Sequence, residues 1–474
     1  MLFLFLIIPL AALVLLNLPL GSWLRRMGWG LALALTALQA GVMLYAPQIV
    51  APGSGPVAAF LALRLTADDI SRILLLTIGI VSFAVLLIAR DAVQDEGRRA
   101  NFVNVLLLAL IGMNGTVLLS DVFSLYVFME ITSVCSFILI ASDRDRNGLE
   151  GAFKYIILSA VATVLMLTGV ALLLVFAGGT SFDEVRQGLL AADGNLVARV
   201  AMGAFVCGLL VKGGLVPFHG WVPDAYSAAP APVGVLLAGI ATKASGVYAL
   251  VRLVTSVLPP SAALNEALLV VGLASVVVGA LAALGQNDMR RLLAYSSISQ
   301  VGYIILGLGC GTALGLAGAV LHLFNHAIFK ALLFVNAAAV KRQLGTTDMR
   351  RMGGLGSRMP VTGASCAVGA LSTAGVPPLS GFWSKLIVII ALWQSHHQAY
   401  AVAGALFSVV TLAYMLTMQR KVFFGRTPES LAAVKEAPMT LVAPAVLLAG
   451  VTIGVGALFP LLMYSLWPHM QGLW

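Results

Sequence analysis

The feature that most constrains this chain is a series of fourteen apolar runs separated by short charged or Gly- and Pro-containing segments. Most runs are close to the ~20 residues that a helix needs to cross the hydrocarbon core of a bilayer. Only 10% of the residues are charged, whereas a soluble domain carries about 25%, and the 60% apolar content excludes disorder. We therefore predict an all-α polytopic membrane protein with about 14 transmembrane helices. The predicted spans are 2–20, 29–46, 72–89, 101–119, 122–141, 155–177, 197–216, 233–255, 264–284, 293–310, 313–338, 361–394, 400–418 and 438–466.

Basic residues are distributed unevenly between alternate connections of these spans. One set of connections holds 19 Lys and Arg, and the opposite set holds five. Because basic connections stay in the cytoplasm, both termini are predicted to lie on the non-cytoplasmic side of a bacterial or archaeal inner membrane. No basic residue precedes the first run, which favours a span over a signal peptide. The larger set is Arg25, Arg26, Arg90, Arg98, Arg99, Arg144, Arg146, Lys154, Arg290, Arg291, Lys341, Arg342, Arg350, Arg351, Arg358, Arg420, Lys421, Arg426 and Lys435, and the smaller is Arg64, Arg72, Arg186, Arg199 and Arg252.

Two spans, the seventh and the twelfth, contain helix-breaking residues. Pro217 follows two glycines in the seventh, and Pro377 and Pro378 follow Gly375 in the twelfth. Interrupted helices at corresponding positions are typical of transporters built from inverted repeats. We predict a first repeat of spans 4–8 (residues 101–255) and a second of spans 9–13 (264–425). Spans 1–3 (1–100) precede them, and span 14 (438–474) follows.

Five charged residues lie inside apolar runs: Glu130, Lys212, Lys243, Lys330 and Lys385. A charge at mid-bilayer costs about 2.5–3.5 kcal/mol on insertion scales, so five in one chain indicate function. Structural alternatives exist for three of them. Glu130 could hold helices together through hydrogen bonds, Lys243 could reach an interface, and Lys385 could be a helix-terminal lysine of the basic side. Lys212 and Lys243, on neighbouring spans, repel when both are charged, which favours proton transfer between them.

A polar stripe runs along the eleventh span. His322, His326 and Lys330 follow one another at intervals of one helical turn and share a face. A histidine pair with this spacing can bind zinc, but a third ligand is not evident and the pattern alone is weak. The stripe is better interpreted as part of a hydrated proton path. The four cysteines lie in apolar runs without metal or redox spacing, and nucleotide, flavin and haem motifs are missing from the sequence. We predict no metal and no cofactor in this chain.

The motifs resemble the antiporter-like subunits of the complex I superfamily. They are KGGLVPFHGWVPDA at 212–225, APAPVG at 229–234, and HAIFKALLF at 326–334, over a similarity of about 100–425. The superfamily includes NADH:quinone oxidoreductase, membrane-bound hydrogenase and formate hydrogenlyase complexes, and Mrp-type cation/proton antiporters. The resemblance implies fourteen helices, the same repeats, and broken helices 7 and 12. It also implies that Glu130 pairs with Lys212, that Lys243 is the connecting lysine of the eighth span, that His322 and His326 belong to a central polar axis, and that Lys385 is the terminal lysine of the twelfth span.

The leading hypothesis is a proton-translocating subunit of a multisubunit complex I-like or Mrp-type complex, with Na+/H+ exchange left open. Protons would pass along Glu130, Lys212, Lys243, His322, His326, Lys330 and Lys385. The chain would not be catalytic alone, and its partners would be other membrane subunits, lipid and the transported ion, with no nucleic acid. The motifs fit the shorter subunits of the family equally well, that is, the M- and N-type subunits of complex I and the D-type subunit of Mrp antiporters. Two alternatives are a stand-alone transporter of a small solute and a non-conducting scaffold for a redox arm.

Overall fold

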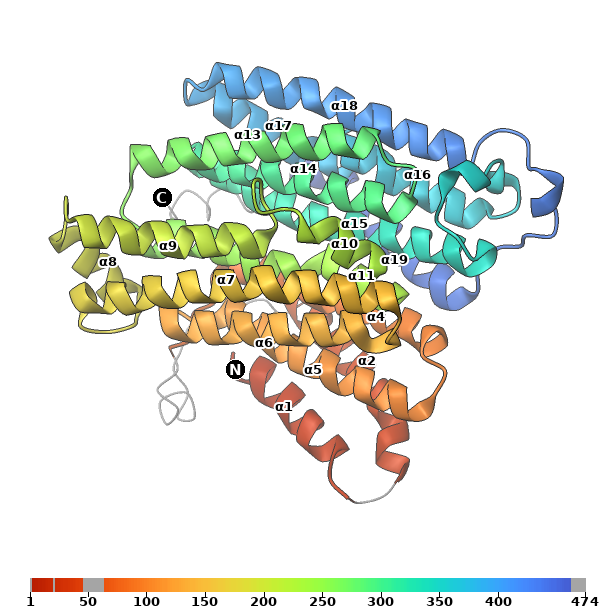
Figure 1. Cartoon of the computed structure of the whole chain (residues 1–474), viewed down its shortest axis with the longest axis horizontal. Helices are drawn as coiled ribbons and strands as arrows, with labels where there is room; N and C mark the ends of the chain where they lie inside the picture. The colour runs from red at the N-terminus through yellow and green to blue at the C-terminus, as the bar shows by residue number, and fades with distance from the viewer. Residues whose placement is uncertain (1, 20–21, 46–63, 462–474) are drawn as a thin grey trace. The chain divides into compact units, whose positions relative to one another are not determined.

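The computed structural model describes residues 2–19, 22–45 and 64–461 and is built from helices (Figure 1). Within this described part, twelve helices are long and apolar enough to cross a membrane. Their backbone groups are satisfied internally, as hydrocarbon requires. The bounds are α2 (Ser22–Tyr45), α4 (Asp69–Ala92), α5 (Glu96–Leu118), α6 (Val122–Ile140), α7 (Arg146–Ala177), α9 (Leu196–Gly213), a composite helix (231–257), α13 (Ala262–Leu284), α14 (Met289–Gly309), α15 (Ala313–Leu344), α18 (Gln398–Val422) and α19 (Met439–Ala457).

Three predicted spans differ from the helices observed. The first predicted span, 2–20, is observed as the shorter helix α1 (Leu4–Leu16). The twelfth predicted span, 361–394, is divided into α16 (Pro360–Ala374) and α17 (Ser380–Gln394). The last predicted span ends at 466, and its final five residues lie outside the described residues. The total of about fourteen spans therefore stays a prediction. An additional amphipathic helix, α8 (Phe182–Ala191), follows α7 and begins with a capping box formed by Ser181 and Glu184.

The chain divides into two compact units. Unit 1 comprises 1–214 and 240–261, and unit 2 comprises 215–239 and 262–474. Within unit 1, α5 packs on α6, α6 on α7 and α7 on α9, and these helices run side by side in Figure 1. Aspartates satisfy exposed backbone donors at the starts of α4, α5, α6 and α7. The four capping residues are Asp68, Asp95, Asp121 and Asp145.

Unit 2 packs around α15, which is buried along its apolar length. Helix α14 lies against α13 and α15, and α17 and α18 pack on the same group. Leu269, Tyr303, Leu306, Val388 and Leu392 form a buried cluster between α13, α14 and α17. A helix enclosed on all sides can keep polar side chains only where other helices supply partners, so the polar stripe of α15 requires partners or water.

The helix from 231 to 257 is wound unusually wide. It begins as α11 (Ala231–Leu236), continues as π-helix in η3 (Leu237–Ala241) and η4 (Lys243–Tyr248), and ends with α12 (Ala249–Arg252) and the π-helical η5 (Leu253–Val257). π-Helical turns are rare, and they are frequent at functional sites. Lys243 is the first residue of η4.

A matching backbone connection occurs once in each unit. In unit 1, Val122 N–H donates to the Thr180 carbonyl, and the Thr180 hydroxyl donates to Asp121. In unit 2, Met289 N–H donates to the Thr347 carbonyl, and the Thr347 hydroxyl donates to Asp288. We call these the two clasps. Each joins the start of one helix, α6 or α14, to the segment that follows the next helix, α7 or α15.

Candidate functional site

Unit 1 contains a buried ion pair between Glu130 of α6 and Lys212 of α9. The Lys212 Nζ atom lies 2.7 Å from Glu130 Oε1. The lysine side chain is 0% exposed and the glutamate side chain 23% exposed. Desolvating two charges costs several kcal/mol per ion unless further hydrogen bonds complete the pair. The surroundings of these two groups therefore decide whether the ionised pair is stable.

Hydroxyl groups from two helices complete this pair. Lys212 Nζ donates to Ser133 Oγ of α6 at 2.8 Å and to Ser159 Oγ of α7 at 3.0 Å. Thr163 Oγ1 of α7 donates to Glu130 Oε1 at 2.7 Å. An ammonium has three N–H donors, and Glu130, Ser133 and Ser159 supply three acceptors. The site thus accommodates a charged lysine without an unsatisfied donor.

Local backbone structure fixes the position of Lys212. The residue is the penultimate one of α9, and Gly214 ends the helix in the left-handed region at φ 68°. A positive side chain is favoured at this end by the helix dipole. Gly246 of η4 packs on the same segment, because a Cβ built there would lie 2.7 Å from the Lys212 carbonyl carbon. The helix that carries Lys243 therefore approaches the backbone of Lys212 as closely as glycine allows.

Lys243 is buried with 1% of its surface exposed, which does not fit a side chain that reaches an interface. Its Nζ atom lies 3.4 Å from Thr242 Oγ1. Farther along the same helix, Arg252 binds both carboxylate oxygens of Asp68 at 2.5 Å and donates to the Tyr248 hydroxyl at 2.7 Å. Burial alone would raise the pKa of the Asp68 carboxyl, but the hydrogen bonds and charge of Arg252 hold it below the usual 3.8.

Unit 2 brings His322 of α15 against α17. His322 Nδ1 lies 2.9 Å from Ser384 Oγ, and Asn325 Nδ2 donates to the Ser380 carbonyl at 2.9 Å. The rings of His322 and His326 are stacked, with centroids 6.3 Å apart. His322 Nε2 and Asn325 Oδ1 are buried without a hydrogen-bond partner in the described part of the chain. Buried polar atoms of this kind bind water in proteins.

Lys385 lies directly behind the break in the twelfth span. Its Nζ atom donates to the Thr373 carbonyl at 2.8 Å and lies 4.6 Å from the centroid of the Tyr303 ring. Thr373 belongs to the last turn of α16, where the carbonyls have no partner within the helix. The helix break therefore supplies an acceptor for Lys385, which is only 3% exposed.

Lys330 contacts a third helix. Its Nζ atom donates to Ser296 Oγ of α14 at 2.7 Å and lies 3.3 Å from the Leu293 carbonyl. The Ser296 hydroxyl lies 2.9 Å from the Tyr414 hydroxyl of α18. Lys330 thus points to a cluster of hydroxyl groups that the sequence did not reveal, because serine and tyrosine in apolar helices carry no pattern of their own.

The interruptions of the seventh and twelfth spans share their local geometry. Gly214 and Gly375 both end a helix in the left-handed region, and a cis proline follows three residues later, Pro217 after Val216 and Pro378 after Pro377. Both interruptions lie where the sequence placed helix-breaking residues. Glu130, Lys212 and Lys243 belong to unit 1, whereas His322, His326, Lys330 and Lys385 belong to unit 2.

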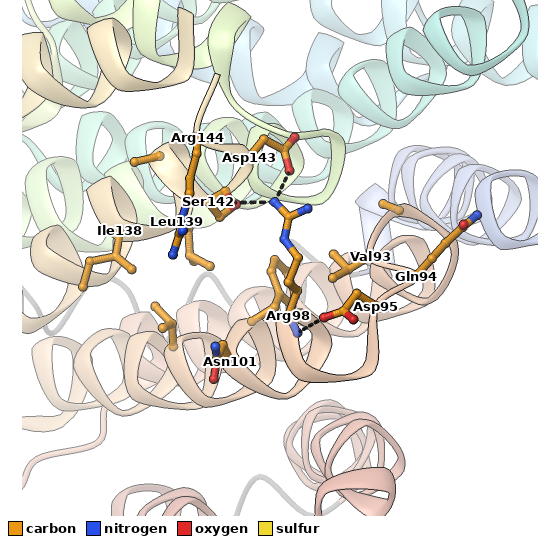
Figure 2. A pocket seen from close by; sticks show the side chains of 14 residues that line it. Val93, Gln94, Asp95, Arg98, Asn101, Ile138, Leu139, Ser142, Asp143 and Arg144 are labelled. Atoms are coloured by element: carbon orange, nitrogen blue, oxygen red, sulfur yellow. Dashed lines mark hydrogen bonds and ion pairs between the residues drawn. The ribbon is translucent and has the colours of Figure 1, made fainter. Parts of the chain in front are cut away.

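The described residues contain no group of three His, Cys, Asp or Glu that could hold a metal ion. A separate cavity of about 670 Å³ in unit 1 lies between the segments 92–105 and 138–144. Figure 2 shows Arg98 extending toward Ser142 and Asp143 at its rim, with the apolar side chains of Ile138 and Leu139 along its wall. None of the seven predicted translocation residues lines this cavity.

Comparison with known proteins defines the family. The model of the NADH:quinone oxidoreductase/Mrp antiporter transmembrane family matches residues 120–411, which is more than half of the chain. This protein belongs to that family. The match contains all seven predicted translocation residues and both helix breaks, and with the twelve apolar helices it identifies an integral membrane protein.

Members of the family from two kinds of complex are similar to this chain. The D-type subunit of the Na+/H+ antiporter of Alkalihalophilus pseudofirmus is 33% identical over 409 residues, 85% of this chain and 82% of that relative. The N-type subunit of the NADH-quinone oxidoreductase of Desulforudis audaxviator is 32% identical over 412 residues, again 85% and 82%. A chain in the structure of the Mrp complex from Dietzia sp. DQ12-45-1b has a TM-score of 0.89 at 25% identity, covering 100% of this chain and 96% of that one.

Proposed function

We propose that this chain is a proton-translocating membrane subunit of a multisubunit complex of the Mrp or complex I type. The observation that carries the proposal is the buried pair of Glu130 and Lys212. A purely structural pair would be replaceable by apolar residues at little cost or even with a gain in stability. Here the lysine is held by three acceptors, while the glutamate keeps some exposure through which its charge can be changed.

The pair can operate as a switch. While Glu130 is ionised, its charge stabilises the ammonium of Lys212. When Glu130 is neutralised or its contact is lost, the ammonium remains buried with only Ser133 and Ser159 as acceptors. A buried lysine without a counter-charge releases its proton more easily, and Lys243 is the proposed recipient. The route would continue through His322, His326 and Lys330 to Lys385, with water at the unsatisfied atoms of α15.

The two clasps and the two glycine–proline breaks support inverted repeats. Both pairs of features follow the order that spans 4–8 and 9–13 would have, with α6 and α7 corresponding to α14 and α15. In the topology predicted from basic residues, the clasp at Asp121 would face the non-cytoplasmic side and the clasp at Asp288 the cytoplasmic side. We therefore propose about fourteen spans, two inverted repeats, and both termini on the non-cytoplasmic side of a bacterial or archaeal inner membrane.

Other membrane subunits are the proposed partners, since the relatives named above are subunits of larger assemblies. The transported ion is the proton, alone or in exchange for Na+. The energy would come from an ion gradient or from a redox reaction in another subunit. Buried ionisable groups spread over several helices suit the stepwise transfer of protons and not the binding of an organic solute, which needs several polar groups converging on one pocket.

The test uses the assembled complex in inverted membrane vesicles, with proton movement followed by a pH-sensitive dye. Glu130→Gln and Lys212→Met each remove one charge of the pair. We expect a loss of about 10²-fold in transport rate, the usual scale for removing a proton-transferring group. Glu150 and Lys154 form a matched control pair, because their ion pair of 2.7 Å lies at the surface of α7 with side chains 54% and 42% exposed.

Glu150→Gln and Lys154→Met should transport at the wild-type rate. The amount of assembled complex is measured for every variant on native gels, so that a loss of assembly is not counted as a loss of transport. Wild-type transport by assembled Glu130→Gln and Lys212→Met complexes would contradict the proposed function.

A further inference from the structure

A line of buried hydroxyl groups leads away from Lys330 toward α18. Lys330 Nζ contacts Ser296 Oγ at 2.7 Å, and Ser296 Oγ contacts Tyr414 Oη at 2.9 Å. Lys330 and Ser296 are 0% exposed and Tyr414 is 1% exposed. Three side chains from α15, α14 and α18 thus form one hydrogen-bonded chain. The proposed route from His326 to Lys385 uses neither Ser296 nor Tyr414.

Further buried polar groups continue this line beyond Tyr414. Thr411 and Gln300 face the Tyr414 hydroxyl. Both amide atoms of Gln419 and Nδ2 of Asn336 are buried, and within the described part of the chain they make no hydrogen bond of ordinary geometry. Leaving a buried donor or acceptor unsatisfied costs about 1–3 kcal/mol, and native proteins avoid this cost by holding water at such atoms.

Asn336 lies between Lys330 and the end of α15 at Leu344, and Gln419 lies between Tyr414 and the end of α18 at Val422. Gln419 is three residues from Val422, the last residue of α18, and Asn336 Oδ1 accepts a hydrogen bond from Ser365 of α16 at 2.9 Å. Cys366, the next residue of α16, faces Gln419. Arg420 and Lys421 follow directly, and the predicted topology places them on the cytoplasmic side. The polar groups therefore extend from the helix ends on that side to the hydroxyl pair beside Lys330.

We propose that Ser296 and Tyr414 form a proton-loading branch that recharges Lys330 from the face where α18 ends. The inference rests on the proposed function and adds to it a route of supply. A water held by Gln419 and Asn336, protonated from the α18 face to hydronium, would donate its excess proton to Tyr414 Oη while that hydroxyl passes its own proton to Ser296 Oγ. Ser296 in turn passes its proton to the lone pair of neutral Lys330. Each hydroxyl ends neutral, and the positive charge moves from the water to the lysine.

Other titratable groups surround this branch, and they define what the pH experiment below can detect. On α15 they are His322 and His326, and the remaining elements contribute Tyr303 of α14, Cys366 of α16, Lys385 of α17 and Arg420 of α18, which interact with Tyr414, Gln419 or His322 or follow Gln419 directly. These groups are unchanged in the variants below. A difference between variant and wild type in the pH dependence therefore reports on Ser296 and Tyr414.

The experiment measures proton translocation by the assembled complex carrying Tyr414→Phe or Ser296→Ala. Each variant interrupts the line but keeps most of the packing, so we expect the rate to fall by about 10²-fold. The double variant should be no slower than the slower single one, because the two hydroxyls act in series. Ser296→Thr keeps the hydroxyl and should retain the rate.

Two matched controls remove hydroxyls that the branch does not use. Ser297 is also buried and donates to the Leu293 carbonyl one turn back in its own helix. Tyr226 is buried and donates to the Leu237 carbonyl at 3.2 Å. Ser297→Ala and Tyr226→Phe should transport at the wild-type rate.

Acidifying one face at a time distinguishes loading from a structural role. If supply through the branch is lost, the rate of Tyr414→Phe should rise in proportion to the proton concentration on the α18 face and not on the opposite face. Wild-type transport by both single variants would overturn the branch, and so would a loss that acidification of the α18 face does not relieve. Lys212→Met in the same vesicles separates the two proposals: if it also transports normally, the proposed function fails as well.

Discussion

Gly246→Ala is the substitution for which the structure gives the sharpest expectation. A Cβ at this position would lie 2.5 Å from Gly213 N, 2.6 Å from Gly213 Cα and 2.7 Å from the Lys212 carbonyl carbon. Ordinary Cβ contacts fall between 3.4 and 4 Å. All three atoms are backbone atoms of the end of α9, so a side-chain rotation cannot relieve the overlap. The helix that carries Lys243 must therefore move away from α9 by close to 1 Å.

Two consequences follow from that displacement. Overpacking of a tight interface costs about 1–3 kcal/mol of stability, which an assembled membrane complex should survive. Proton transfer is more sensitive, because a misplacement of ~1 Å in a reacting geometry can cost about 10²-fold in rate. We expect Gly246→Ala complexes to assemble and to transport protons at about one hundredth of the wild-type rate.

The assay is dye-monitored proton movement in inverted vesicles, with the amount of complex determined on native gels. Gly203→Ala is the matched control, since Gly203 lies on α9, the partner helix of this contact, and a Cβ there meets nothing within 4 Å. Wild-type transport by Gly246→Ala would refute the argument that the close contact of these two helices sets the transfer geometry. Equal losses in Gly246→Ala and Gly203→Ala would refute it too.

Two further predictions concern stability in unit 1, measured by unfolding in detergent. Asp68→Asn leaves the buried Arg252 without its counter-charge and should lower the free energy of unfolding by about 3 kcal/mol. The pKa of Asp68 is lowered in the folded state. The contribution of the wild-type ion pair to stability is therefore complete above pH 3.8 and is lost as the pH falls through the lower folded pKa. A small effect of Asp68→Asn at pH 7 would contradict this. The amides of Gln39 and Asn114 donate to each other's oxygens at 3.0 Å, so Asn114→Leu should cost about 1–3 kcal/mol, and combining it with Gln39→Leu should cost less than the sum of the single changes. Strict additivity would show that the two amides do not act as a pair.

The sequence was informative about where charges and interruptions lie. Lys212, Lys243, Lys330 and Lys385 could be identified because a charge inside an apolar run is rare. The interruption of the twelfth span was predictable because proline and glycine disfavour a continuous helix. The membrane class followed from the apolar runs alone, and the structure and the family match confirm it.

The partners of these charges could not be predicted from the residues alone. Ser133, Ser159 and Ser296 lie in apolar helices, where serine usually bonds to a carbonyl of its own helix, so their contacts with lysines depend on packing between helices. The π-helical winding from 237 to 257 was also missed. It leaves no periodic signal, because this helix is buried on all sides and has no polar face whose spacing would reveal the winding.

The two clasps bear on how directionality could arise in a duplicated scaffold. The proposed repeats keep the same joints, a capping aspartate with a threonine, and the same glycine–proline turn. Their interiors differ: Lys212 precedes its turn and is matched by a carboxylate, whereas Lys385 follows its turn and is matched by a backbone carbonyl. Two identical halves in opposite orientation would conduct equally both ways. Two repeats that share their backbone connections but hold their lysines with different partners would make proton transfer easier in one direction across the membrane than in the other.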